Sequence, residues 1–579
     1  MATLKLIQFS GEIPRLIPRL LPDTAAQRAE NVRLDDGGLT PIRIPGIEHT
    51  LTGFTAGQVK TIYKHAGEWL AWTVPVKAAP GPVAADRLYY TGDGKPKMRV
   101  SGSVYDLAVN GPTAAPTVTL TGTGSGDIYS ALYVYTFLTA FDEESEPSPV
   151  SNTVNWQAGK TVTLSGFSAP DPGRNITKMR LYRLQQSVQS GADLYFIAER
   201  TVSTADWIDN VAIDAFAEVL PSRDWNPPPD GLSGLISLPN GMMAGFVGKD
   251  LYFCEPFHPH AWPEKYVLTM DYTIVGLGAF GNTIVVATTG NPYIVTGSAP
   301  ENMQQEKLEL NLPCINPNGV VDLGYTVAYP SNDGLVTVDS SGPKLYNDLF
   351  TRPGWQKTNP SSYIAGQFSG RYFASFSYIE ADGKTTEGTF IIDLSGEQPF
   401  LLRAKDRADA FFYEQGTGSL YLLLGLDIYE WDRLGQTNAI MTWKSKLFVL
   451  PQPSSFGAIL VEGDDALSVE ERAAKQAERQ AILDANALIF GNASLGGEFN
   501  GAAMNAYAIE GDDLARIDPD GFVSVKIYAD TELIATIGKI NEVMRIPAAR
   551  ARNWEVQVNG TRPVTQISLA TTARELNSI

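Results

Sequence analysis

Apolar and polar positions alternate with a period of two along most of the chain, and this alternation is typical of β-strands. Residues 59–74 are an example, because two alternating, aromatic-rich segments flank the short turn His65-Ala66-Gly67. Turn signals such as Gly92-Asp93-Gly94 separate further segments of the same kind. The sequence therefore predicts a mainly β protein built from many short hairpins.

A loose repeat of β units runs through residues 231–442. Each unit has an apolar strand, a turn with Gly, Asn or Asp, and a second strand. A β repeat of about 40–45 residues is typical of β-propeller blades. We expect about six blades, with one contributed by residues 59–105, before the repeat begins. The five unit starts predicted within 231–442 are Gly234, Thr273, Val320, Tyr363 and Ala408.

Residues 106–230 interrupt this repeat with a segment rich in Thr, Val and Tyr. About seven short strands are predicted, which suggests a β-sandwich inserted into the propeller. The strand Tyr133-Val134-Tyr135 leads toward the turn Ser145-Glu146-Pro147-Ser148, a combination that resembles fibronectin type III-like domains. The insertion ends at a proline-rich, stiff linker over residues 225–231.

Near the N-terminus, Ile13-Pro14-Arg15-Leu16 is followed at once by Ile17-Pro18-Arg19-Leu20. Prolines four residues apart exclude a regular helix and favour extended backbone. Two interpretations stay open: a surface loop, or an arm that lies on another subunit. In the arm interpretation, Arg15 and Arg19 are the candidate contact residues.

Two helices are predicted within this β pattern. Thr24 and Gln27 have the spacing of a capping box, which predicts a short helix there. Ser468 and Glu471 have the same spacing, and Ala, Glu, Lys, Gln and Arg dominate up to about residue 488. A glycine-rich stretch follows this second helix before the β pattern returns.

These patterns divide the chain into five parts. They are an N-terminal arm with part of a β platform (1–58), a blade that closes the propeller (59–105), an inserted β-sandwich (106–230), a β-propeller (231–442), and a C-terminal β platform (443–579) that carries a helical and glycine-rich insertion (464–511).

Composition and charge exclude several classes of function. The 579 residues include 45 Lys and Arg against 64 Asp and Glu, a net charge of −19. Tight, static nucleic-acid binding relies on Lys and Arg and is therefore not expected, although DNA can still pass by. Two cysteines and four histidines argue against a disulfide framework and a multi-histidine metal site. No apolar run is long enough to span a membrane.

Local motifs supply little chemistry. Cys254, His258 and His260 form a weak candidate metal site, but no second ligand cluster exists and prolines between them indicate a loop. The glycines of residues 276–281 match a dinucleotide fingerprint, yet a strand follows where that fingerprint requires a helix. We therefore expect a blade hairpin there, and no metal, cofactor or catalytic residue. A carboxylate-pair glycosidase stays open, because its two acids need not be close in sequence.

Segments near both ends resemble the nozzle, or tail tubular protein B-like, family of short-tailed bacteriophages. The resemblance spans both ends and the propeller-like middle, and is weakest at residues 110–230 and 461–520. The segments that carry it are Phe9–Leu16, Leu20–Pro22, Ala29–Leu34, Gly38–Pro41, Trp554–Gly560 and Val564–Ala570.

This resemblance implies a structural virion protein without enzymatic activity. Its copies would form a homo-oligomeric, hexameric ring below the tail adaptor protein, would be assembled in the host cytoplasm, and would close the tail channel until double-stranded DNA passes as transient cargo. Tail fibres or tail tip proteins are the other expected partners. The alternative is a β-propeller polysaccharide-binding protein or glycosidase, which rests on fold analogy alone.

An acidic lumen would repel DNA phosphates and keep the duplex sliding, so acidic residues are expected to line such a channel. Residues 461–520 hold thirteen Asp and Glu against four Lys and Arg, nearly half of the net charge. The candidate gate or lumen residues are Glu470, Glu471, Asp512 and Asp513.

Overall fold

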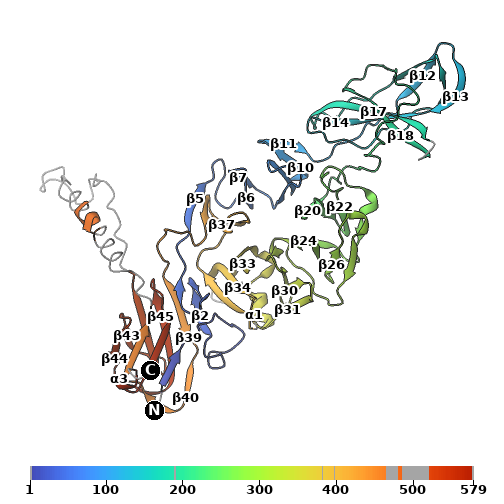
Figure 1. Cartoon of the computed structure of the whole chain (residues 1–579). Helices are drawn as coiled ribbons and strands as arrows, with labels where there is room; N and C mark the ends of the chain where they lie inside the picture. Colours follow the sequence, from blue (N-terminus) through green and yellow to red (C-terminus); the bar gives the residue numbers. More distant parts are fainter. Residues whose placement is uncertain are drawn as a thin grey trace.

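The computed structural model describes residues 3–187, 191–380, 383–396, 398–463, 477, 480–485 and 521–576. It confirms a mainly β protein, and Figure 1 shows an elongated chain with three connected parts: a platform that holds both termini, a ring of sheets, and a projecting sandwich. Among the described residues, no helix is long and apolar enough to cross a membrane.

The platform brings the two ends of the chain together. Strand β1 pairs with β46, and Leu39 and Val564 exchange backbone hydrogen bonds of 2.8 and 2.9 Å. The sheet β1-β46-β41-β44 shares one core with strands β2, β39, β40, β42, β43 and β45, which belong to a ten-stranded sheet. The platform elements are β1 (Thr3–Leu6), β2 (Ala26–Glu30), β3 (Val32–Arg33), β4 (Thr40–Pro41), β39 (Met441–Ser445), β40 (Phe448–Ser455), β41 (Ala458–Glu462), β42 (Val523–Ala529), β43 (Glu532–Ile537), β44 (Val543–Arg545), β45 (Arg550–Gly560), β46 (Gln566–Ala570) and α3 (Ala573–Leu576).

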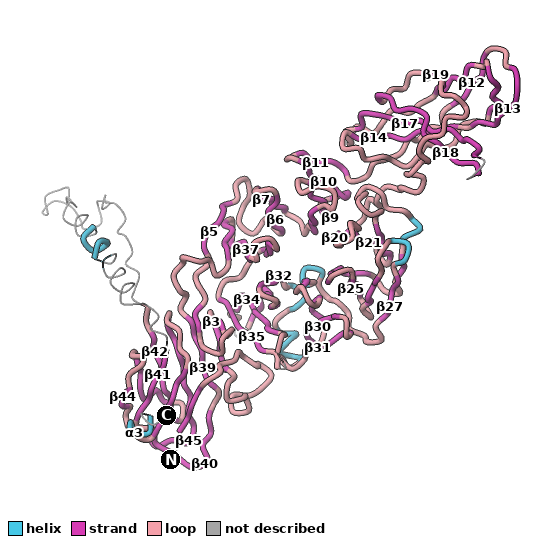
Figure 2. The backbone as a smooth tube through the Cα atoms, in the orientation of Figure 1, coloured by secondary structure: helices cyan, strands magenta, loops and turns pink. Residues whose placement is uncertain are grey.

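Seven groups of antiparallel strands, six of four strands and one hairpin, follow one another in the described part of the ring. One of these groups, β32–β35, is not a separate sheet, because β35 pairs with β2 and so continues into the ten-stranded sheet of the platform. The fourth strand of the last sheet comes from the N-terminal part of the chain, because β5 pairs with β38. First strands of successive groups contact one another from β8 through β20, β24, β28, β32 and β36 to β6. Figure 2 shows the resulting ring of strands. The sheets are β6 (Thr61–His65) and β7 (Glu68–Trp72); β8 (Lys77–Pro80), β9 (Arg87–Gly92), β10 (Gly94–Val100) and β11 (Ser103–Asp106); β20 (Ser233–Ser237), β21 (Met243–Val247), β22 (Asp250–Phe253) and β23 (Leu268–Thr269); β24 (Ile274–Phe280), β25 (Thr283–Thr288), β26 (Tyr293–Thr296) and β27 (Gln304–Lys307); β28 (Val321–Asp322), β29 (Val327–Ser331), β30 (Gly334–Asp339) and β31 (Gly342–Tyr346); β32 (Ile364–Phe368), β33 (Arg371–Ile379), β34 (Thr385–Asp393) and β35 (Phe400–Ala404); β36 (Ala410–Glu414), β37 (Ser419–Leu424), β38 (Asp427–Glu430) and β5 (Gly46–Thr50).

This arrangement is that of a β-propeller. The first strands of the five sheets after residue 231 begin within two residues of the predicted unit starts. The short helices of the ring lie in its connections: η1 (Glu264–Tyr266), η2 (Pro300–Asn302), η3 (Pro317–Gly319), α1 (Arg352–Lys357) and η4 (Pro360–Ser362).

The prediction of a single unit at 59–105 is wrong, because this segment forms two sheets. The hairpin β6–β7 ends at Trp72, and the chain then starts the separate sheet β8–β11. The two sheets contact through the rings of Trp72 and Tyr90, whose centroids are 5.3 Å apart, and through an ion pair between Arg99 and Glu68. The alternating pattern does not distinguish one four-stranded sheet from a hairpin beside a second sheet.

Gly276 and Gly278 have a packing role, Gly281 occupies the turn with a φ of +57°, and the expected hairpin is confirmed. A Cβ atom on Gly278 would lie 2.6 Å from Cγ1 of Val327, and one on Gly276 would lie 2.8 Å from Cγ2 of Val320. Both contacts are with the next sheet of the ring. Strand β24 therefore needs glycine because its neighbour approaches too closely for any side chain.

The inserted part, residues 117–209, is a sandwich whose sheets pack face to face around one core. In its two-stranded sheet β13–β15, strand β13 is mostly exposed. Strand β14, in the sheet β14–β17–β18, is fully buried. Figure 1 shows the sandwich projecting from the ring beyond β11. Its strands are β12 (Thr117–Thr121), β13 (Ser125–Ala131), β14 (Tyr133–Thr139), β15 (Val154–Ala158), β16 (Thr161–Ser165), β17 (Ile176–Ser187), β18 (Gly191–Thr201) and β19 (Trp207–Asp209).

The Ser-Glu-Pro-Ser segment covers the free edge of β14. Ser145, Ser148 and Ser151 recur every three residues, and each backbone N–H donates to a carbonyl of β14. Each serine hydroxyl oxygen also accepts the backbone N–H of the same β14 residue, for example Tyr135 at 3.1 Å from Ser148 Oγ. The serines thus satisfy buried backbone groups that a neighbouring strand would otherwise satisfy.

Neither predicted helix is supported in full. The helix at Thr24–Gln27 is wrong, since residues 26–30 form β2 and pair with β39. Side-chain capping is a local preference that pairing within a buried sheet overrides here. Of the predicted helix at 468–488, residues 480–485 are helical, and most of the insertion 464–511 lies outside the described residues.

Candidate functional site: the arm and the sandwich joint

The arm, defined here as residues 13–22, consists of two successive β-turns. In the first, Leu16 N–H donates to Ile13 O at 3.0 Å; in the second, Leu20 N–H donates to Ile17 O at 2.9 Å. Proline occupies the second position of each turn, where its fixed φ is favoured. The expected extended backbone is therefore wrong, although the exclusion of a regular helix holds.

The first turn is attached to its own chain. Ile13 is 5% exposed and packs with Leu21 and Ala25. Arg15 N–H donates to Leu349 O at 2.8 Å, and its Nη1 lies 2.9 Å from Asp348 Oδ1. Arg15 is thus paired within the chain by an exposed ion pair, and its role as a contact residue for another subunit stays a prediction.

The second turn is exposed. Ile17 and Leu20 are 52% and 60% exposed, and Arg19 is exposed without an ion-pair partner among the described residues. Its backbone is nevertheless fixed, because Leu447 N–H donates to Pro18 O at 3.0 Å. Figure 1 shows this part of the chain between β2 and α1, beside the platform.

A buried carboxylate joins the base of the arm to the ring. Glu12 is 3% exposed, and its two carboxylate oxygens accept from Arg403 Nε at 3.0 and 2.8 Å. Ala29 N–H donates to the same carboxylate at 2.9 Å. Burial raises the pKa of Glu12, while Arg403 opposes that shift. This network fixes the arm to β35 and β2, so the arm leaves a rigid base.

The predicted metal ligands do not assemble into a site. Cys254 is fully buried, accepts from Met243 N–H at 3.0 Å, and burial raises the pKa of its thiol to about 12. His258 Nδ1 lies 2.8 Å from Pro256 O. No group of three His, Cys, Asp or Glu side chains suited to a metal occurs in the part of the chain that the structure describes.

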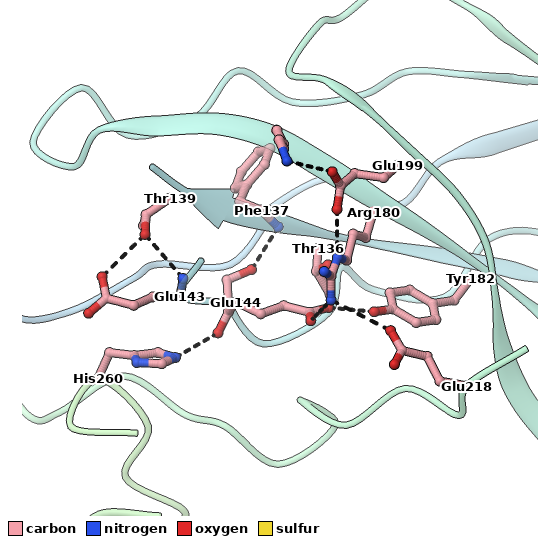
Figure 3. A network of polar contacts seen from close by, with 12 residues as sticks. Thr136, Phe137, Thr139, Glu143, Glu144, Arg180, Tyr182, Glu199, Glu218 and His260 are labelled. Atoms are coloured by element: carbon pink, nitrogen blue, oxygen red, sulfur yellow. Dashed lines mark hydrogen bonds and ion pairs between the residues drawn. The ribbon is translucent and has the colours of Figure 1, made fainter. Parts of the chain in front are cut away.

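The third candidate ligand, His260, instead belongs to the contact between sandwich and ring. Its Nε2 lies 3.0 Å from the backbone oxygen of Glu144, a residue of the sandwich (Figure 3). Burial lowers the pKa of His260 to about 3, so its imidazole group is neutral at physiological pH. The predicted gate residues Glu470, Glu471, Asp512 and Asp513 lie outside the described residues.

We call the contact around Arg87, Glu143, Glu144, Arg174 and His260 the sandwich joint. Glu143, which follows β14, lies 2.5 Å from Nη2 of Arg174 in the sandwich and 3.5 Å from Nη1 of Arg87 in the ring. The side chains of Glu143 and Arg174 are only 6% and 2% exposed. Burial raises the pKa of Glu143, while the two guanidinium groups oppose the shift.

Glu144 holds the sandwich side of the joint together. Its Oε1 accepts from the hydroxyl groups of Thr136 and Tyr182, both at 2.7 Å, and its Oε2 lies 3.1 Å from Arg180 Nη1 (Figure 3). Arg180 also pairs with Glu199 at 3.1 Å. Both oxygens of this carboxylate are satisfied by side chains of the sandwich, so the network stabilises the sandwich side of the joint.

No local pattern in the sequence indicates this joint. Acids beside Pro and Ser usually lie in solvated turns, so residues 142–146 carry no local sign of burial. Its partners are distant: Arg174 is 31 residues from Glu143, and the interaction of His260 with Glu144 spans 116 residues. The local features that distinguish this run from an ordinary turn are its several acids and the regularly spaced serines that follow them.

One cleft beside the joint combines acids with aromatic residues. It has a volume of about 540 Å³, and its lining includes Glu146, Glu264, Tyr252 and Trp262. Burial raises the pKa of Glu146. Trp262 is 1% exposed and offers no open face on which a sugar ring could stack. The cleft therefore gives the glycosidase alternative an acid pair, and the partly exposed Tyr252 is the aromatic side chain of its lining that a sugar could reach.

Comparisons with known proteins leave the chain without an assigned family. No family model matches it, and no curated protein matches it. One similar solved structure is the N-terminal domain of Nup159, at 10% identity and a TM-score of 0.23, covering 48% of this chain and 70% of that one.

A second similar structure is PorZ, a surface component of the type-IX secretion system of Porphyromonas gingivalis. It has 12% identity and a TM-score of 0.22, and the match covers 69% of this chain and 45% of PorZ. The chain thus spans less than half of the length of PorZ. Similarity at this level carries no information about function, and the β-propeller class stands on the sheet topology of the chain itself.

Proposed function

We propose that this chain is a structural protein of a short-tailed bacteriophage, of the nozzle or tail tubular protein B-like type. In this proposal its copies form a ring at the distal end of the tail tube that gates and conducts DNA during ejection. The chain has no enzymatic role. It acts in the virion, and its DNA contact is transient.

One observation carries the proposal: the two resembling ends, more than 500 residues apart in sequence, form a single platform. Leu39, in one of the N-terminal segments, pairs with Val564, in one of the C-terminal segments. Residues of both ends, including Trp554, lie in the same buried core. Two sequence segments that form one structural unit support a shared origin better than two unrelated short matches.

The finer architecture belongs to the same proposal. We interpret the six four-stranded sheets as six blades and the hairpin β6–β7 as an incomplete seventh. We interpret the inserted sandwich as fibronectin type III-like, with the serine ladder on β14 as its characteristic edge. The expected partners are further copies in a hexameric ring, an adaptor protein above it, and tail fibres or tip proteins at the projecting sandwich.

The test is the solution state of the full chain. Size-exclusion chromatography with light scattering should give a mass near an integer multiple of 62.8 kDa, and negative-stain images should show a closed ring with a central channel. A monomer at every concentration, or an open filament, would refute the proposal. A saccharide-dependent rise of the melting temperature in a monomeric chain would instead support the polysaccharide alternative.

A further inference from the structure

We propose that the second Ile-Pro-Arg-Leu turn, residues 17–20, is the element by which one copy of this chain binds a second copy. This inference rests on the proposed ring and names its contact. The two tetrapeptides are identical in sequence, but their surroundings differ in the structure. The isoleucine of the first packs against its own chain, whereas the apolar side chains of the second are exposed.

The two turns share their backbone geometry. Each closes a hydrogen bond from the leucine N–H to the isoleucine carbonyl, at 3.0 Å in the first turn and 2.9 Å in the second. The side chains differ only in their surroundings: Ile13 is 5% exposed, whereas Ile17 is 52% exposed. The second turn therefore presents to solvent an isoleucine of the kind that the first turn buries, whereas the prolines and arginines of both turns are exposed.

The residues around the first turn show what such a surface binds. Ile13 enters a small apolar cluster with Leu21 and Ala25, and Leu16 packs against it. Arg15 Nη1 lies 2.9 Å from the carboxylate of Asp348 and 3.1 Å from Asn347 O. The complement of the exposed turn is thus a small apolar cluster beside a carboxylate, and one such combination surrounds the first turn.

A second copy of the chain is the occupant that fits these requirements. The chain carries a net charge of −19, so carboxylates for Arg19 are abundant on its surface. The exposed turn is held by Leu447 and, through Glu12, by Arg403, so binding does not have to order a flexible segment. A turn on one copy that binds a different surface on the next is a heterologous contact, which is the kind that closes rings.

The experiment compares variants of the full chain by light scattering over a dilution series. Ile17→Asp/Leu20→Asp and Arg19→Glu alter the exposed turn, and Ile128→Asp is the matched control, because Ile128 is 64% exposed on the sandwich. We expect the double variant to raise the concentration for half-assembly at least about tenfold, with circular dichroism and melting temperature of the monomer unchanged. Arg19→Glu should have a smaller effect of the same sign, and the control should assemble normally.

Each outcome decides the inference. Normal assembly of Ile17→Asp/Leu20→Asp overturns it while leaving the ring proposal intact, whereas a wild-type chain that stays monomeric overturns both. If the aspartate variant loses its β signal, Ile17→Ser/Leu20→Ser is judged by the same criterion. Assembly that is lost equally in the Ile128→Asp control would mean that the effect is not specific to the turn, and this also overturns the inference.

Discussion

The sandwich joint makes a prediction about the two halves of its buried ion pair. Glu143→Gln removes the carboxylate and leaves Arg174 in place; Arg174→Met removes the guanidinium and leaves Glu143. Although both changes break the same 2.5 Å contact, we expect different costs, because the two partners have different alternatives.

Arg174 depends on Glu143 more than Glu143 depends on Arg174. The Nε and Nη1 atoms of Arg174 are buried without hydrogen-bond partners, so the carboxylate is its main compensation. Glu143 keeps Arg87 at 3.5 Å and the hydroxyl group of Thr139 at 3.2 Å. Breaking a buried pair typically costs about 3–5 kcal/mol, so we place Glu143→Gln at the upper end of this range and Arg174→Met at or below its lower end.

The double variant tests the reasoning further. Burial raises the pKa of Glu143 despite both guanidinium groups, which indicates that the pair does not fully offset its desolvation. Glu143→Gln/Arg174→Met should therefore be more stable than Glu143→Gln alone, because it removes the most deeply buried guanidinium together with its carboxylate. The remaining guanidinium, that of Arg87, is more exposed, at 14% against 2% for Arg174.

Hydrogen exchange by mass spectrometry is the appropriate assay, since the chain has several units and one global unfolding free energy is not defined. Protection should fall in β14 and β17 and stay unchanged in β24 and β25, which serve as the internal control. Equal losses in the two single variants, or a double variant that is the least stable of the three, would refute the asymmetry argued here.

Three further predictions concern single residues. Ser148→Ala should destabilise the sandwich by about 1–3 kcal/mol by leaving the buried N–H of Tyr135 unsatisfied, measured by hydrogen exchange in β14, and a cost equal to that of exposed Ser130→Ala would contradict the ladder. Gly278→Ala should lower the melting temperature through about 1–3 kcal/mol of overpacking, whereas Gly416→Ala, with open space and no positive φ, should not; similar values for both would argue against close packing in the ring. The folded-state pKa of His260 is lowered to about 3, so its contribution is present above its ordinary pKa of 6.5 and is lost as pH falls between 6.5 and about 3, by at most about 1.4 kcal/mol per pH unit. His260→Gln should flatten that part of the pH–stability profile, and an unchanged profile would show that the histidine is not buried neutral.

The repeat in residues 231–442 was predictable because each sheet is built from strands that are neighbours in sequence. Antiparallel hairpins need only local turns and alternating side chains, and both are visible in the sequence. The close packing of Gly278 against Val327 was not predictable in the same way, since it depends on how near two successive sheets lie.

The exposure of the arm and the burial of the sandwich joint could not be predicted from the sequence. The two identical tetrapeptides do not distinguish Arg15 from Arg19. In the structure Arg15 pairs with Asp348, which lies more than 300 residues later in the chain. The acids before the serine ladder had the composition of a solvated turn, yet Glu143 is buried because Arg174 and Arg87 meet it there.

The sequence by itself thus determined the class of structure, the spacing of the sheets and the existence of an insertion, since these follow from local alternation and turn chemistry. Tertiary structure alone decided that both ends form one platform, that the second turn of the arm is exposed, and that the sandwich is fixed by buried charges. These features depend on contacts between residues that are far apart in the chain, and no local pattern encodes the distance between them.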